Sequence, residues 1–201
     1  ILAVVAIIGL LIAILLPSLS KAKTQARRAT CASQLHQVGL AMMAYMQDNR
    51  DRMPFISAMP SIGPFPLETA RPVTMADVLK RHLKGNMNAL HCPEDKPDNP
   101  YLNEPRPAPN AGRSYFETEQ SSYEYRFPLA GLTPTEFNNR EARFGGVGRR
   151  PHWHHNQDAQ KNIAPNTIYF ARDYNNFHAP SGQQGSRRYV YIDGHVSDYE
   201  S

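Results

Sequence analysis

The apolar residues of this chain are concentrated at its N-terminal end. Residues 1–16, ILAVVAIIGLLIAILL, carry no charge, although the mean hydropathy of the whole chain is negative. A membrane-spanning helix needs about 20 apolar residues, and the core helix of a globular protein is normally amphipathic. We therefore interpret residues 1–17 as a helix that lies in lipid or in the core of an assembly, and we expect more residues upstream of Ile1. A secretory signal is the alternative, but no persuasive cleavage site follows Pro17.

A second pattern predicts that this helix continues to about residue 48. No Gly or Pro interrupts residues 18–38, and two stripes recur at helical spacing. The later stripe is large and apolar, which predicts packing on the chain's own globular part: Cys31, Leu35, Val38, Met42, Tyr45 and Met46. The earlier stripe is small, which favours close approach of another helix: Leu19, Ala22, Ala26 and Ala29. Alanines that only raise helix propensity are the alternative explanation of the earlier stripe.

The polar remainder of the chain predicts a small, loop-rich head. We divide the chain into a stem, residues 1–50, and a head, residues 51–201. A capping arrangement that begins at Thr74 predicts a short helix over about residues 74–84.

Strands are predicted later in the chain. β-rich runs occupy residues 121–127 and 167–171. The Asp193-Gly194 pair lies between two further runs and predicts a C-terminal hairpin over about residues 188–199, with a two-residue type I′ turn. The expected fold class is therefore α+β, with a long N-terminal helix packed on a small antiparallel sheet.

Composition narrows the classes of function. The chain has 201 residues with 22 Lys+Arg and 18 Asp+Glu, and a net charge of +4 is too mild to indicate nucleic-acid binding by itself. Two cysteines are too few for a disulfide-dense scaffold or a four-thiolate zinc site. Four basic residues follow the apolar run and are placed to meet lipid phosphates or acidic partners: Lys21, Lys23, Arg27 and Arg28.

Several segments together resemble proteins of the type IV pilin family. The stem LLIAILLPSLSKAK, residues 10–23, resembles the family's N-terminal helix. Residues 27–54, RRATCASQLHQVGLAMMAYMQDNRDRMP, resemble a pseudopilin-like subgroup with a Cys, a Gln-hydrophobic-Gly pattern and a Tyr-x-x-Asp end. The Cys92-Pro93-Glu94-Asp95 loop and the terminal Asp193-Gly194-His195-Val196 run resemble that subgroup too.

The chain also departs from the family pattern. The family has a glutamate near the start of its mature chain, after a cleavage site, and neither is present here. The subgroup usually has a His at the place of Gln183, and the nearest candidate, His178, lies further upstream.

The resemblance implies a structural protein without catalytic activity. Such subunits are anchored in the inner membrane by the stem, cleaved by a prepilin peptidase, and stacked by an assembly machinery into an extracellular or periplasmic filament with the stems inward. We therefore expect a self-associating pilus subunit. The expected filament core is Ile1, Leu2, Val4, Val5, Ile7, Ile8, Gly9, Leu11, Ile12, Leu15, Leu16 and Pro17. A type II secretion pseudopilin, or a non-polymerising anchored subunit that binds nucleic acid or glycan, is the alternative.

Other chemistry is weakly indicated. Cys31 and Cys92 are candidates for a disulfide between stem and head, because an envelope location is oxidising; two separate buried thiols are the alternative. Asp173 and Asp193 are candidate calcium ligands, although plain turn chemistry explains them as well. No cofactor is required.

Two further clusters are candidates for binding rather than for the fold. The segment His152–His155 has the imidazole density of a zinc or copper site, which is the basis of a metalloenzyme alternative. Arg149-Arg150 and Arg187-Arg188 are candidate contacts for DNA or acidic glycans, if the fold brings them together. Solvated loops are the simpler interpretation of both.

Overall fold

The computed structural model describes residues 2–56, 73–102, 110–125, 131–133, 136, 169–180, 183 and 185–198. Within these ranges the chain forms a long helix followed by a small head, and the fold class is α+β. The helices are α1 (Leu2–Asp48), α2 (Met75–Leu79), the 3-10 helix η1 (Met87–Leu90) and α3 (Tyr115–Glu119). The strands are β1 (Tyr123–Tyr125), β2 (Tyr169–Asp173), β3 (Arg188–Tyr191) and β4 (Val196–Asp198).

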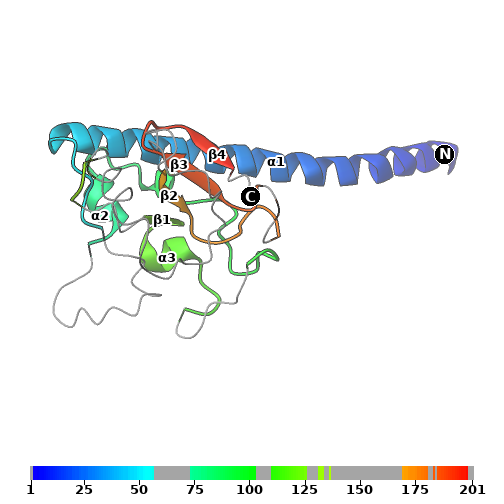
Figure 1. Ribbon diagram of the computed structural model, residues 1–201. Helices are drawn as coiled ribbons and strands as arrows, with labels where there is room; N and C mark the ends of the chain where they lie inside the picture. The colour runs from blue at the N-terminus through cyan, green and yellow to red at the C-terminus, as the bar shows by residue number, and fades with distance from the viewer. Residues whose placement is uncertain are drawn as a thin grey trace.

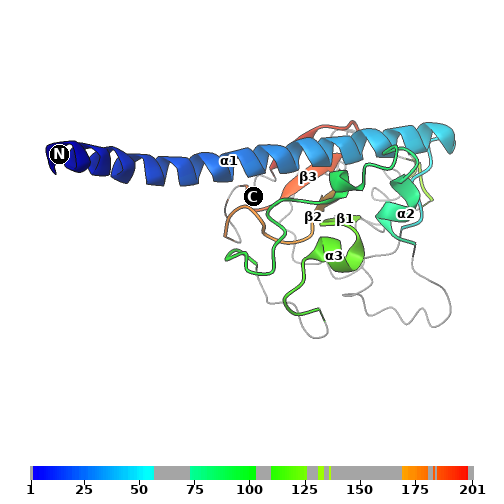
Figure 2. The ribbon, with the colours of Figure 1, turned by 180° about the vertical axis from the view of Figure 1, so that it is seen from behind.

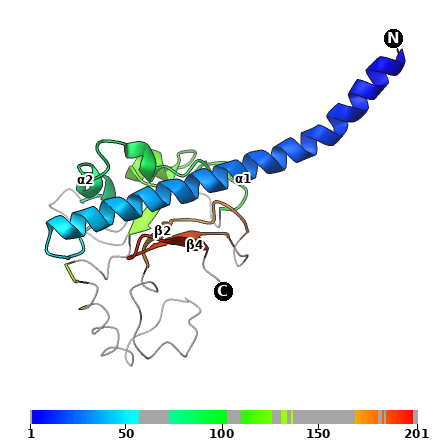
Figure 3. The ribbon, with the colours of Figure 1, turned by 90° about the horizontal axis from the view of Figure 1, so that it is seen from above.

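Helix α1 has 47 residues and passes through Pro17 without a break. At 1.5 Å per residue it is about 70 Å long, and its N-terminal half extends well beyond the head (Figures 1 and 2). The helix is curved rather than straight (Figure 3). It ends at Asp48, close to the predicted boundary, and the chain then turns through the left-handed residues Arg50 and Asp51.

The two halves of α1 have different surroundings. From Ala3 to Ala26 every residue is exposed, and the large apolar side chains from Val4 to Leu19 are 49–66% exposed. By length and composition this is a helix that can cross a membrane, as an anchor or a signal does. The C-terminal half instead packs on the head. Its side chains in the core are Cys31, Leu35, Val38, Ala41, Met42 and Met46, with the half-buried Tyr45 beside them. The later stripe of the sequence therefore faces the head, and the earlier stripe faces away from it.

The described strands form an antiparallel sheet in the order β1-β2-β3-β4. Tyr125, Ala171, Val190 and Val196 lie side by side across it. The first three of these are buried, and this face of the sheet packs toward α1. Tyr123 and Asp173 are opposite one another on the same face, so Asp173 points into the protein.

The β3–β4 hairpin is docked directly on α1. A Cβ on Gly39 would lie 2.8 Å from Val190 Cγ2, and a Cβ on Gly194 would lie 2.9 Å from Met43 Cε. A ring nitrogen of His36 is 2.8 Å from the Gly194 carbonyl oxygen. Glycine at both positions therefore allows helix and turn to approach closely.

The hairpin turn differs from the predicted type I′ turn, which requires positive φ at two residues. Only Gly194 is left-handed, with φ +84°, and Asp193 is not. The Gly194 N–H donates to the Tyr191 carbonyl and the Tyr191 N–H donates to the His195 carbonyl. This pattern is that of a three-residue loop with a glycine bulge. Gly194 therefore takes the left-handed bulge position that follows the turn, and Asp193 stays at negative φ.

The predicted short helix is partly correct. Thr74 and Asp77 form the expected capping box, but α2 ends at Leu79 rather than residue 84. Turn hydrogen bonds continue to Gly85, where Lys84 and Gly85 both take positive φ. The strand predicted at residues 121–127 is observed as Tyr123–Tyr125, and residues 126–127 lie outside the described part of the chain. The strand predicted at residues 167–171 is observed as β2, which continues to Asp173; residues 167 and 168 lie outside the described part of the chain.

Candidate metal centre

Four side chains that can ligate a metal meet where α1 packs on the head. Cys31 comes from α1, Cys92 from the loop after η1, Asp173 from the end of β2, and His178 from the segment that follows β2. Their ligand atoms all lie within 4.8 Å of one another. Cys31, Cys92 and Asp173 are 0% exposed and His178 is 1% exposed. The cluster is therefore closed to solvent.

Short contacts connect the four groups. Asp173 uses both carboxylate oxygens: Oδ2 is 3.2 Å from His178 Nε2, and Oδ1 is 3.6 Å from Cys31 Sγ. His178 Nε2 is also 3.8 Å from Cys92 Sγ. The Tyr123 hydroxyl lies 3.4 Å from Cys31 Sγ. The other ring nitrogen of His178, Nδ1, is buried without a hydrogen-bond partner in the described part of the chain.

The Cys-Pro-x-Asp loop holds Cys92 in place. The Cys92 N–H donates to Ser122 Oγ, and the Ser122 hydroxyl donates to Asp95 Oδ2 at 2.7 Å. Asp95 also accepts the N–H groups of Tyr115 and Phe116, the first two residues of α3. The buried Asp95 carboxylate thus connects the Cys92 loop to Ser122 and to the start of α3.

The stem holds the same loop from the other side. Arg27 on α1 forms an ion pair with Glu94, with 3.3 Å between Arg27 Nη1 and Glu94 Oε1. Arg28 donates a hydrogen bond to the His178 carbonyl. These two arginines therefore contact the chain's own loops. The sequence pattern had instead suggested contacts with lipid phosphates or acidic partners.

The segment from β2 to β3 holds the remaining two groups. The Arg188 N–H donates to Asp173 Oδ2 at 2.8 Å. Asn99 donates to the Phe177 carbonyl at 2.9 Å, which fixes the residue before His178. The antiparallel pairing of β2 and β3 thus places a backbone donor at the Asp173 carboxylate.

Burial and close contact set the protonation of the cluster when it holds no ion. Burial raises the pKa of Cys31 well above its ordinary value, and it also raises the pKa of Cys92. Burial acts to lower the pKa of His178, but hydrogen bonds to Asp173 and Cys31 outweigh it and raise that pKa to about 10. These shifts favour neutral thiols and a protonated His178 imidazole in the metal-free cluster.

The structure changes two interpretations of these residues. The two cysteines, for which the sequence left a disulfide and two separate buried thiols open, are brought into one cluster as free thiols. The structure does not bring the candidate calcium ligands Asp173 and Asp193 together. Asp173 ends β2 opposite the start of β3, whereas Asp193 follows the far end of β3, whose length is about 10 Å. Asp193 is exposed and contacts His195 at 2.5 Å.

His178 is the member of the cluster whose role the sequence did not indicate. It was singled out only as the nearest histidine upstream of the Asp-Gly turn. Its signal is weak because positions 31, 92, 173 and 178 follow no local spacing and meet only through tertiary packing.

The His152–His155 segment and Arg149-Arg150 lie outside the described residues. Arg187 and Arg188 contact Asn176 and Asp198, so within the described chain they serve the head itself.

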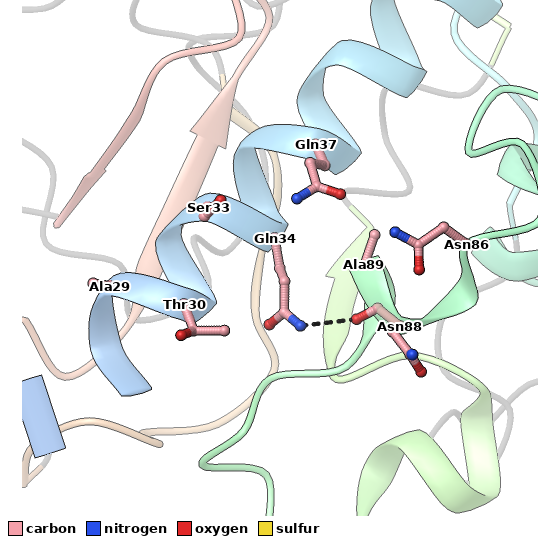
Figure 4. A pocket seen from close by; sticks show the side chains of 8 residues that line it. All are labelled: Ala29, Thr30, Ser33, Gln34, Gln37, Asn86, Asn88 and Ala89. Carbon is pink, nitrogen blue, oxygen red and sulfur yellow. Dashed lines mark hydrogen bonds between the residues drawn. The ribbon is translucent and has the colours of Figure 1, made fainter. Parts of the chain in front are cut away.

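A hollow lies between α1 and the η1 segment (Figure 4). Its lining is made of small and amide side chains, including Thr30, Gln34, Gln37, Asn86 and Asn88, and Gln34 donates to the Asn88 carbonyl at 3.0 Å. No titratable side chain lines it. The hollow therefore offers no titratable acid or base, unlike the buried cluster.

No family model, curated protein or solved structure matches this chain. Its function is therefore argued from its own residues.

Proposed function

We propose that this protein is a structural subunit of a type IV pilus-like filament and that it polymerises through the N-terminal half of α1. The observation that supports this most strongly is the exposure of that half. Its large apolar side chains are 49–66% exposed and no described part of the chain covers them. An apolar surface of this size needs a covering. The same helix continues into the core of the head, so the head is carried rigidly at one end of an apolar rod.

The exposed apolar half of α1 would have different surroundings before and after filament assembly. Before assembly, lipid surrounds it and the helix is a membrane anchor. After assembly, the stems of other copies surround it. Burial of about 1,000 Å² among neighbours is worth roughly 25 kcal/mol gross against water, but extraction from lipid cancels most of this. The net gain then depends on close packing. The exposed Ala22, Ala26 and Ala29 face provides a surface of that kind.

Parallel stacking of such rods places the heads outside. The head lies along one side of the C-terminal half of α1 and leaves the other half free (Figures 1 and 2). Partners of the proposed subunit are other copies of itself, the inner membrane, the assembly machinery and a prepilin peptidase. A surface pilus and a secretion pseudopilus share this architecture, and the location of the filament distinguishes them.

Polar substitutions in the stem test the proposal. The double variant Ile8→Asn, Leu11→Asn is expected to reduce filaments sheared from cells at least tenfold, because it disrupts the close packing between stems on which net assembly depends, and a tenfold loss needs only about 1.4 kcal/mol. Leu40→Asn is the matched control, because Leu40 is 49% exposed on the same helix, close to Ile8 at 50% and Leu11 at 55%. The amount of each variant in the membrane fraction is measured in parallel. Normal filament yield from the double variant contradicts the proposal.

A further inference from the structure

The four-residue cluster has the dimensions of a tetrahedral zinc site. Zinc bonds of about 2.3 Å to sulfur and about 2.0–2.2 Å to nitrogen and oxygen give ligand-to-ligand edges of about 3.3–3.8 Å. Three of the cluster's six edges are 3.2 Å from His178 Nε2 to Asp173 Oδ2, 3.6 Å from Cys31 Sγ to Asp173 Oδ1, and 3.8 Å from His178 Nε2 to Cys92 Sγ, and all four ligand atoms lie within 4.8 Å of one another. We propose that Cys31, Cys92, Asp173 and His178 bind one Zn²⁺ ion.

The donor atoms select this metal class. Two thiolates with an imidazole and a carboxylate suit zinc, whereas Ca²⁺ and Mg²⁺ prefer oxygen ligands alone. Four protein ligands fill a tetrahedral shell and leave no position for water or substrate. All four side chains are buried, which closes the site to larger molecules. The ion is therefore structural rather than catalytic.

Surrounding groups stabilise the ligands in their metal-binding form. Two thiolates and a carboxylate carry three negative charges, and Zn²⁺ neutralises two of them. The Tyr123 hydroxyl is placed to donate to Cys31 Sγ, and the Arg188 N–H donates to Asp173. The backbone N–H of Glu94 also donates to Cys92. Such outer contacts orient the ligands of metal sites and tune their basicity.

The ion would connect three segments that are far apart in the sequence. Cys31 belongs to the stem, Cys92 to the loop after η1, and Asp173 with His178 to the end of the central strand β2. A bond from each to one ion fastens the stem helix to the head, at the point where α1 leaves it. The inference is separate from the filament proposal, since a chain that binds zinc without polymerising still satisfies it.

The test is the metal content of the full chain. The protein is purified in mild detergent without chelators, and its metals are counted by mass spectrometry after dilution in acid. About one zinc per chain is expected. Cys31→Ser, Cys92→Ser and His178→Gln are each expected to reduce zinc at least tenfold. The matched control His82→Gln keeps it, because His82 pairs with Asp48 and lies outside the cluster.

A second measurement does not depend on variants that fold. The chain is stripped with chelator and titrated with Co²⁺, which is expected to give intense visible bands of a tetrahedral ion and thiolate-to-cobalt charge transfer at one equivalent. Thiol counting on the denatured, zinc-loaded chain is expected to find two free cysteines. A Cys31–Cys92 disulfide in the purified protein, thiols that remain metal-free in excess zinc, or a different metal at full occupancy would overturn the inference.

Discussion

Replacing Asp95 by Ala is expected to destabilise the head by about 3–6 kcal/mol. The substitution leaves three buried or half-buried donors without their acceptor: the N–H groups of Tyr115 and Phe116 and the Ser122 hydroxyl. Each unsatisfied donor costs about 1–3 kcal/mol. The measurement is urea denaturation of the detergent-solubilised chain, followed by the near-ultraviolet circular dichroism of the tyrosines in the head.

Glu117→Ala is the control for this change. Glu117 accepts the Ser114 N–H at the same helix end, but its side chain is exposed, so water replaces the lost contact. A much smaller loss of stability is expected. Equal losses for the two variants would show that the buried Asp95 network does not hold the loop.

Replacing Leu35 by Ala is expected to destabilise the head by about 2–5 kcal/mol. Leu35 is 0% exposed and belongs to the core between α1 and the head, so the shortened side chain leaves a cavity. Leu40→Ala, on the same helix but 49% exposed, is expected to change the free energy of unfolding by no more than about 0.5 kcal/mol. The same urea denaturation measures both. If the two substitutions cost the same, the stem does not pack on the head through the face described here.

Much of the stem was predictable because it depends on local pattern. The uncharged run of residues 1–16 predicted a helix without a polar face, and the spacing of Leu35, Val38 and Met42 predicted the face that lies in the core. Hydrophobic periodicity indicates both features directly. The capping box at Thr74 was predictable for a similar reason, since its two partners are three residues apart.

The remaining features depend on contacts between distant segments. The hairpin was placed correctly at Asp193-Gly194, but its turn type depends on which residues take positive φ, and only Gly194 does. The cluster could be predicted only in part. The sequence offered Cys31 and Cys92 as a candidate pair, with two separate buried thiols as the alternative, whereas the places of Asp173 and His178 follow from strand pairing and from the path of the chain after β2.

The cluster lies at the contact that holds the stem helix to the head. In the proposed filament pathway, a force that extracts the subunit from the membrane would act on α1, and the head would follow only if the contact between them holds. Arg27, Arg28 and Cys31 lie where α1 enters the head, and each contacts a different loop or strand of it. Strong fastening at this point is what a polymerising stem requires.

Electron cryo-microscopy of material sheared from the cell surface tests the central claim most directly. The account predicts filaments whose core is a bundle of packed helices, with side-chain density that fits residues 2–17 and heads on the outside. Helical density through Pro17 would match the continuous α1 described here. Protein found only as unassembled subunits in the membrane fraction, or filaments whose core is built from the heads, would contradict the account.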